Sequence, residues 1–541
     1  MVFCSLIRTS ELRSKVLALD NKNKKFCFCF VLSSFIRTSE LRSKVLRSKK
    51  LKYYLVFCSL IRTFACVIQD EIKFKILQAL GHVPTADQRE AVEVFAQFMT
   101  TSHEQPVMIL RGSAGTGKTT LAGAIVRALK SLGRKLVLMA PTGRAAKVFS
   151  LYADHPAYTI HRRIYRQMTS GDRTMFRLND NLHTDTLFIV DEASMIANDQ
   201  TSDLFGSGCL LDDLTEFVYT GRGCSMLLIG DRAQLPPVGE SDAPALSGRV
   251  MRGYGMTVYE TDLYEVLRQS SESGILSNAT AVRNLLLAAE QGEPLTWPRL
   301  HLKGFTDIQR VEGSELVEML ADSYAKVGMD DTIVVTRSNK RAIIYNQGIR
   351  NTILEREARL ERGDQLMIVK NKYGVTVGEA DEDTPDFLAN GDRCVVQRVR
   401  HERQLHGFTF ADATLVLPDY NNFEIDTVVI LDTLTSEAPA LTSEQHEQLY
   451  RSVMEDYADL PYKADRVRAL KSDPYYNALQ VKYGYAVTCH KAQGGQWAHV
   501  YIDQGYITDD MLTPDYVHWL YTALTRATEK VFLVNWRKEE G

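Results

Sequence analysis

The sequence predicts a multi-domain α/β protein built on parallel sheets. Its 541 residues are 45% hydrophobic and 24% charged, which is typical of a globular chain and excludes a disordered or collagen-like one. This length suggests roughly three to four domains. The sequence contains no uncharged apolar stretch of about 18 residues, so a transmembrane helix is not expected. Four short apolar runs alternate with helical patterns, as in strand–helix–strand units, and they lie at residues 107–110, 136–140, 187–190 and 226–229.

The formal charge of −3 averages two unlike segments. Residues 1–66 carry 14 Lys and Arg against 3 Asp and Glu, whereas the rest of the chain carries 50 against 64. The same segment repeats itself, because VFCSLIRTSELRSKVL at residues 2–17 returns almost unchanged at residues 31–46. Such repetition is typical of translated tandem DNA. We therefore expect residues 1–66 to be disordered or non-native, with synthesis starting near Val67, where VIQDEIKFKIL predicts an amphipathic helix.

Cysteine usage bears on the compartment. Five of the nine cysteines lie within residues 1–66, and the other four are far apart and lack metal-ligand spacing. A long chain with few scattered cysteines is typical of a reduced, cytoplasmic protein. We expect a monomer with no membrane attachment.

A phosphate-binding loop follows the first apolar run. Residues 107–110 lead into GSAGTGKT, and a helical pattern comes next. Strand, glycine loop and helix in this order are the context of a P-loop, whose backbone N–H groups wrap phosphates. We expect Lys118 to bridge the β- and γ-phosphates of ATP and the Thr119 hydroxyl to ligate Mg²⁺. The predicted nucleotide contacts here are Gly112, Ser113, Ala114, Gly115, Thr116, Gly117, Lys118, Thr119 and Thr120.

Two later apolar runs end in residues suited to the same chemistry. Residues 187–190 deliver Asp191 and Glu192, and residues 226–229 lead into GDRAQLPPVG, which contains Gln234. We expect Asp191 to hold Mg²⁺ and Glu192 to orient or deprotonate the attacking water. Gln234 is expected to reach the γ-phosphate. An acidic pair at a strand end is usually a solvated turn, but its place after a P-loop favours catalysis.

In this order, GSAGTGKT, DEAS and GDRAQLPPVG resemble motifs I, II and III of superfamily 1 helicases, and the Leu-Pro-Pro form resembles the RecD/Dda branch. The resemblance covers about residues 83–537. PTGRAAK and Thr159-Ile160-His161 are similar to motifs Ia and Ib, YAVTCHKAQGGQW to motif V, and YTALTRA to motif VI. One departure is Gln496, where many relatives carry an acidic residue.

The resemblance implies further site residues. Gln88, in a stretch similar to the Q motif, is expected to read adenine. Arg268, in a stretch similar to motif IV, and Arg526, in motif VI, are expected to bring cations to the transferring phosphoryl group. Single-stranded DNA is expected to contact Pro141, Thr142, Arg144, His161, Thr488, His490 and Lys491, with Lys147, Arg162 and Arg163 adding charge.

The implied architecture is two RecA-like P-loop domains with two insertions. The first domain is expected over residues 67–255, and the second over 256–352 plus 480–541. Within the first, residues 165–184 predict a β-hairpin, which in this family acts as a strand-separating pin, although an ordinary surface hairpin fits equally well. Residues 353–479 contain short β-type runs broken by Gly, Asn and Asp, which predict a small β-barrel, of the Src-homology-3 type in this family.

The resemblance implies an ATP-dependent helicase or translocase that moves 5′→3′ on single-stranded DNA and opens duplex junctions. Because the chain beyond residue 66 is acidic, its DNA path is expected to be a local basic groove. Three alternatives stay open: a DNA-stimulated ATPase subunit of a RecD-like nuclease complex without unwinding activity, an RNA helicase, and a nucleotide-gated binding module. Repair and recombination roles both fit, and no intrinsic nuclease is expected.

Overall fold

The computed structural model describes residues 67–101, 103–170, 173–198, 206–265, 273–373 and 387–536. The repeats of residues 1–66 therefore lie outside the described residues. The chain divides into two compact units, Met1–Ile72 and Lys73–Gly541, and the sheets, the barrel and the sites described below belong to the second. The helix predicted from Val67 onward is present over residues 67–80.

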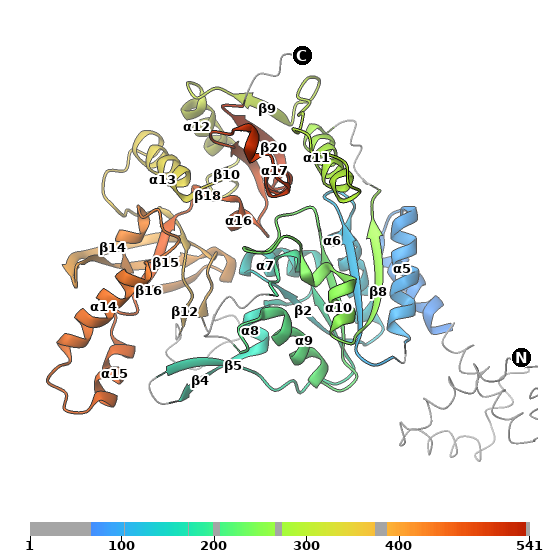
Figure 1. The fold of residues 1–541 in the computed structure, drawn as a ribbon, viewed down its shortest axis with the longest axis horizontal. Coiled ribbons are helices and arrows are strands. Elements are labelled where there is room, and N and C mark those ends of the chain that lie inside the picture. The colour runs from blue at the N-terminus through green and yellow to red at the C-terminus, as the bar shows by residue number, and fades with distance from the viewer. Residues whose placement is uncertain are drawn as a thin grey trace, which may run out of the picture. The chain divides into compact units, whose positions relative to one another are not determined.

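The first α/β domain is a six-stranded sheet in the order β3-β2-β6-β7-β1-β8. Strands β2 and β8 of this sheet are labelled in Figure 1. Every neighbouring pair is parallel. The four predicted apolar runs all lie in its strands, which confirms the parallel-sheet prediction. The strands are β1 (Pro106–Gly112), β2 (Lys135–Ala140), β3 (Ala157–Thr159), β6 (Thr186–Val190), β7 (Ser225–Gly230) and β8 (Thr257–Leu263).

Strand β8 moves the domain boundary. Residues from 256 onward were expected in the second domain, but β8 pairs with β1 from Pro106↔Thr257 to Gly112↔Leu263. Its sequence, TVYETDL, is not a continuous apolar run because it forms the edge of the sheet, where only Thr261 and Leu263 are buried. The first domain therefore extends to Leu263.

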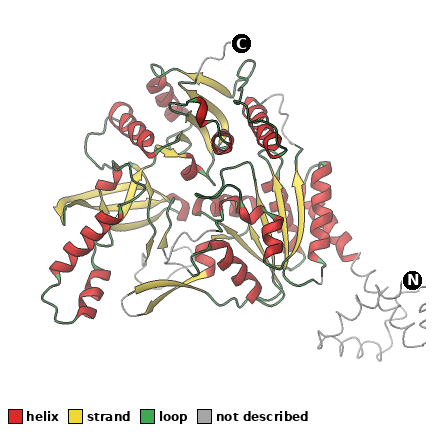
Figure 2. Cartoon of the chain, viewed as in Figure 1, coloured by secondary structure: helices red, strands yellow, loops and turns green. Residues whose placement is uncertain are grey.

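Helices cover both faces of this sheet (Figure 2). Because side chains alternate along a strand, Val107 and Ile109 share one core cluster with Leu211 and Leu214 of α9. The helices are α5 (Ala86–Met99), α6 (Lys118–Ser131), α7 (Gly143–Ala153), α8 (Ile160–Ile164), α9 (Leu210–Thr220) and α10 (Gly248–Gly253). The predicted hairpin is present as β4 (Tyr165–Ser170) paired antiparallel with β5 (Arg173–Leu178).

The second α/β domain is a parallel sheet in the order β18-β10-β19-β20-β9. Its strands are β9 (Ile308–Val311), β10 (Thr332–Thr336), β18 (Ala486–Thr488), β19 (Trp497–Asp503) and β20 (Ala527–Val534). Its helices are α11 (Gly274–Glu290), α12 (Leu316–Lys326), α13 (Asn339–Gly348), α16 (Cys489–Ala492) and α17 (Pro514–Leu524). Two parallel sheets thus confirm the predicted fold class.

The predicted β-barrel interrupts the second domain between α13 and β18. Five strands close it, and two helices lie between its last two strands. The elements are β11 (Gln365–Ile368), β14 (Arg393–Leu405), β15 (Phe408–Leu417), β16 (Phe423–Ile430), α14 (Ser443–Asp456), α15 (Lys463–Ser472) and β17 (Leu479–Tyr483), beside the small pair β12 (Lys372–Tyr373) and β13 (Phe387–Leu388). The closing strand β17 carries the barrel to Tyr483, past the expected end at residue 479.

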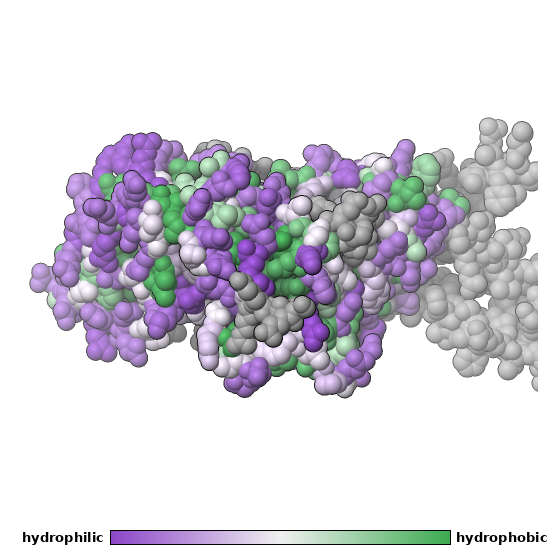
Figure 3. All heavy atoms as spheres, turned by 90° about the horizontal axis from the view of Figure 1, so that it is seen from above, coloured by the Kyte–Doolittle hydropathy of each residue, from purple (hydrophilic) through white to green (hydrophobic). Residues whose placement is uncertain are grey.

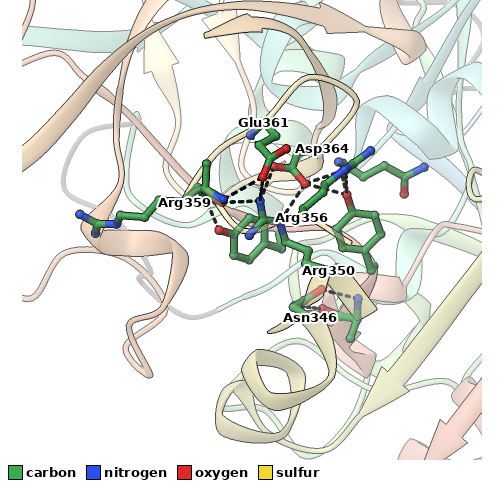
Figure 4. Close-up of polar contacts among 11 residues, drawn as sticks. Asn346, Arg350, Arg356, Arg359, Glu361 and Asp364 are labelled. Carbon is green, nitrogen blue, oxygen red and sulfur yellow. Dashed lines mark hydrogen bonds and ion pairs between the residues drawn. The ribbon is translucent and has the colours of Figure 1, made fainter. Parts of the chain in front are cut away.

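A buried ionic cluster joins the barrel to the second α/β domain (Figure 4). Asp364, which is 0% exposed, accepts hydrogen bonds from Arg350 Nε at 2.9 Å, Arg356 Nη1 at 2.7 Å and the Tyr485 hydroxyl at 2.9 Å. Beside it, Asn346 of α13 exchanges two hydrogen bonds of 2.8 Å with the backbone of Ala486 in β18. The start of the barrel is therefore fixed to the residues that begin motif V.

Hydrophilic side chains predominate on the face drawn in Figure 3, and apolar side chains appear there as smaller, separate patches. None of the described helices is both long and apolar enough to cross a membrane.

Candidate nucleotide and nucleic-acid sites

The P-loop connects β1 to α6 and is shaped by glycine. Gly115 and Gly117 have φ of +78° and +79°, which favours glycine over residues with a side chain. A Cβ at Gly112 would lie 2.7 Å from Thr116 Oγ1. Lys118 Nζ donates to Ser113 O at 2.9 Å and to Gly112 O. The Lys118 amine therefore donates to backbone oxygens of the loop. It would donate in the same way to phosphate oxygens of a nucleotide.

Gln88 braces this loop from α5. It is fully buried, its Nε2 donates to Thr116 O at 3.3 Å, and its Oε1 accepts from the backbone N–H of Thr85 at 3.3 Å. Both ends of the amide are thus bound to backbone. The adenine contact implied by the resemblance stays a prediction.

The acidic pair follows β6 at the carboxyl edge of the sheet. Asp191 Oδ1 accepts the N–H of Glu192 at 2.9 Å, and Glu192 has a left-handed backbone with φ of +51°. Burial, and then the charge of Glu192, raise the pKa of Asp191 to about 7. A nearby divalent cation would favour the ionised carboxylate, so Asp191 suits Mg²⁺ together with Thr119, which follows Lys118 in α6.

Gln234 lies in the loop after β7, which we call the motif III loop (Asp231–Leu235). Its side chain is 5% exposed, and its Oε1 has no hydrogen-bond partner within the described residues. Buried acceptors are usually paired, so an orphan oxygen indicates a group that a ligand or water completes. An amide oxygen can accept a hydrogen bond from an attacking water, and the γ-phosphate contact expected of Gln234 stays a prediction.

The second α/β domain brings two residues to the P-loop that sequence reasoning missed. The N–H of Ala114 donates to the Tyr521 hydroxyl at 2.9 Å, and Arg283 of α11 donates to Ser113 Oγ. Tyr521 belongs to the YTALTRA stretch, so motif VI itself was a signal for it. Arg283 has no local signal, because only the tertiary fold places α11 beside the loop.

The two predicted phosphate-binding arginines differ in what the structure describes. Arg268 lies outside the described residues. Arg526 is 3% exposed, and it donates to Thr522 O at 3.1 Å and Gly495 O at 3.2 Å. It therefore holds the motif V loop, and its contact with a phosphoryl group stays a prediction.

The predicted DNA residues of the first domain cluster around α7. Thr142, which follows Pro141 at the end of β2, caps this helix by accepting the N–H of Ala145 at 3.2 Å. The Arg144 guanidinium stacks 3.9 Å from the Trp497 ring and donates to Gln496 O. Burial lowers the pKa of Arg144 to about 9. Arg144 thus bridges the two domains.

The other basic residues predicted to contact DNA near α7 differ in charge and in surroundings. Lys147 is 3.9 Å from Asp419 of the barrel. Burial lowers the pKa of His161 to about 4, so His161 is neutral at physiological pH and would contact DNA as an uncharged ring. The guanidinium groups of Arg162 and Arg163 lie 5.7 and 5.5 Å from the ring of Tyr158.

The predicted DNA residues of the second domain lie around α16. Thr488 precedes this helix, and Lys491 donates to Asn390 Oδ1 near the barrel. Burial and the charge of Lys482 lower the pKa of Lys491 to about 8, and burial lowers that of His490. Both α7 and α16 follow the carboxyl ends of parallel strands, the edge where α/β sheets bind ligands.

Comparisons with known proteins match both α/β domains. The family model of an AAA domain matches residues 84–294, and that of the UvrD-like helicase C-terminal domain matches residues 483–534. The ATP-dependent RecD2 DNA helicase of Deinococcus radiodurans is 26% identical over 432 residues, which are 79% of this chain and 46% of the relative. The ATP-dependent DNA helicase dda of phage T4 is 33% identical over 181 residues, 32% of this chain and 37% of the relative.

Among solved structures, the Pif1 helicase from Bacteroides in complex with ADP-AlF3 and ssDNA gives a TM-score of 0.43 at 15% identity, over 84% of this chain and 93% of that chain. The chain spans less than half the length of the RecD2 and dda relatives. The two matched families lie on the chain in the order of the helicase motifs, with the P-loop in the first and motifs V and VI in the second. Both α/β domains of the chain are therefore similar to superfamily 1 helicases of the RecD/Dda branch.

Proposed function

We propose that this chain is an ATP-dependent DNA helicase that couples hydrolysis to 5′→3′ movement on single-stranded DNA. One observation carries the proposal: residues of both α/β domains meet at the P-loop, where Ala114 bonds Tyr521 and Ser113 bonds Arg283. A change in nucleotide state at the loop would therefore alter the contact between the domains. The direction rests on the resemblance to the RecD/Dda branch.

The residues of the site divide the chemistry between them. ATP with Mg²⁺ would supply the transferable phosphoryl group. The P-loop amides and Lys118 would hold the phosphates, while Thr119 and Asp191 would hold the metal. Glu192 would orient or deprotonate the attacking water, and Gln234 would reach the γ-phosphate.

The DNA path would cross the carboxyl edges of the two sheets, over α7 and α16. Arg144 and Lys147 on one side and Lys491 on the other supply positive charge, and the acidic remainder of the chain confines binding to this groove. The hairpin β4–β5 is the candidate pin for separating a duplex. The DNA helicase names of both curated relatives favour DNA over RNA.

Two experiments test the proposal. The first is ATPase activity with and without single-stranded DNA or RNA, with Lys118→Ala as the inactive control. The second is unwinding of duplexes with a 5′ or a 3′ tail. We expect stimulation by DNA and unwinding from the 5′ tail. No stimulation by any polynucleotide would refute the motor, and preference for a 3′ tail would refute the direction.

A DNA-stimulated ATPase subunit of a RecD-like nuclease complex is the second candidate, because the resemblance to the RecD/Dda branch fits it as well. It predicts DNA-stimulated hydrolysis without unwinding by the isolated chain.

A further inference from the structure

The hydroxyl of Tyr521 contacts the P-loop at a place where a phosphate oxygen of a bound nucleotide would otherwise lie. Its hydroxyl accepts the N–H of Ala114 at 2.9 Å and donates to Asp231 Oδ2 at 2.6 Å. The side chain is 1% exposed, so water does not compete for these bonds. Backbone N–H groups of a P-loop are the groups that bind phosphate oxygens. The hydroxyl oxygen of Tyr521 therefore accepts the backbone N–H of Ala114 that a phosphate oxygen would otherwise accept.

The position of Asp231 indicates which phosphate of ATP would lie close to the Tyr521 hydroxyl. Asp231 Oδ2 is 3.8 Å from Lys118 Nζ, the amine that meets the β- and γ-phosphates in a P-loop. Tyr521 contacts the same carboxylate, so its hydroxyl lies at the terminal-phosphate end of the loop. Burial and Asp231 raise the pKa of Tyr521 well above its usual value, so the phenol stays protonated and its O–H donates a hydrogen bond to Asp231.

The helix that carries Tyr521 is fastened to the motif III loop along one face. His518, Tyr521 and Thr522 are spaced at i, i+3 and i+4, which places them on the same side of α17. His518 Nδ1 lies 3.0 Å from Ala233 O, and Thr522 Oγ1 accepts the N–H of Leu235 at 2.8 Å. Gln493 of motif V adds a bond of 2.6 Å to Leu235 O. Displacing Tyr521 would therefore act on motif III, motif V and α17 together.

We propose that Tyr521 is a positioning residue that competes with the terminal phosphate of ATP for the amide of Ala114, so that nucleotide binding releases α17 from the P-loop. This inference rests on ATP binding at the P-loop, as in the proposed function. It adds that Tyr521, a residue of the chain itself, competes with the nucleotide. Loss of the hydrogen bond between Tyr521 and Ala114 would then transmit nucleotide binding to the second α/β domain.

The test is the affinity of the full chain for a fluorescent, non-hydrolysable ATP analogue and for the matching ADP analogue. Tyr521→Phe removes one oxygen and leaves the ring in place. With the competing hydrogen bond gone, we expect the triphosphate to bind about two- to tenfold more tightly, the ratio equivalent to one net hydrogen bond. We expect the diphosphate to gain less, because it lacks the terminal phosphate that the proposal places at the amide of Ala114.

Tyr516→Phe is the matched control. It removes a hydroxyl from the same helix that bonds Gln504 Oε1 at 3.0 Å, away from the P-loop, and we expect no change in affinity. Melting temperatures of both variants check the fold, and Tyr521→Leu repeats the test with a different side chain. General damage would weaken binding, so tighter binding is a signature that a structural role does not give.

The outcomes separate the two claims. A wild-type chain that binds neither analogue overturns the proposed function and this inference together. A wild-type chain that binds the triphosphate, beside a Tyr521→Phe variant that binds it equally or more weakly, overturns only the competition.

Discussion

Arg526 is buried and yet is the residue from which a phosphate contact is expected. Its bonds to Gly495 O and Thr522 O tie motif VI to motif V. A guanidinium has five donors in a planar fork, so it can keep backbone bonds while offering others to a phosphoryl oxygen. Structural and catalytic roles can therefore coexist in this side chain.

Replacing Arg526 separates these roles. We expect Arg526→Ala to retain ATP binding and to lose about a thousandfold or more in turnover, as for other arginines that stabilise a transferring phosphoryl group. Nucleotide affinity and single-turnover hydrolysis measure the two effects. Arg526→Lys keeps the charge without the fork and should remain slow. An alanine variant that hydrolyses ATP at the wild-type rate would remove Arg526 from the site.

The raised pKa of Asp191 gives the metal site a pH dependence. With a pKa of about 7, the carboxyl is mostly protonated at pH 6 and mostly ionised at pH 8. Metal binding needs the ionised form, so the Mg²⁺ concentration for half-maximal ATPase should rise roughly tenfold from pH 8 to pH 6. Magnesium titrations at the two pH values check this. An equal requirement at both would mean that Asp191 does not titrate in this range.

At the scale of elements, the junction of the barrel depends on Asp364. Its carboxylate is buried among two arginines and a tyrosine, and removing one member of such a cluster leaves charges without partners. Asp364→Ala should lower the free energy of unfolding by about 3–5 kcal/mol. Denaturant unfolding measures this, with Asp419→Ala, at the more exposed contact with Lys147, as a control of smaller effect. A loss below about 1 kcal/mol would show that Arg350 and Arg356 find other partners.

Particular elements show how far the sequence predicted the fold. Strands β1, β2, β6 and β7 were found because strands buried on both faces are continuous apolar runs. Edge strand β8 lacks such a run, so the first domain was predicted to end before it. Strand β17 follows two helices, so the predicted end of the barrel at residue 479 left out most of this strand. At the site, residue types and loops were predictable, but their partners were not. The bond of Tyr521 to Ala114 joins residues 407 positions apart and exists only after both domains fold.

At the scale of the whole molecule, we expect the distribution of charge to govern the proposed DNA binding. The chain beyond residue 66 is acidic, so we expect the cations gathered around α7 and α16 to bind the phosphates. With about five phosphate contacts, affinity for single-stranded DNA should fall roughly a hundredfold between 50 and 200 mM salt. Fluorescence anisotropy over this range measures the slope, and Lys147→Ala should make it shallower. Affinity that does not change with salt would refute the basic groove.

The barrel also affects how the protein is made, because it interrupts a sheet. Strand β10 ends at Thr336, but its neighbours β18 and β19 begin at Ala486 and Trp497. At about 5–20 residues per second, a ribosome needs roughly 7–30 seconds to synthesise the intervening chain. During that interval the backbone N–H and C=O groups along β10 have no partner strand, whereas the first domain is already complete. Nascent chains should therefore acquire protease resistance in the first domain well before the second, and the half-made second sheet is the segment with most need of a chaperone.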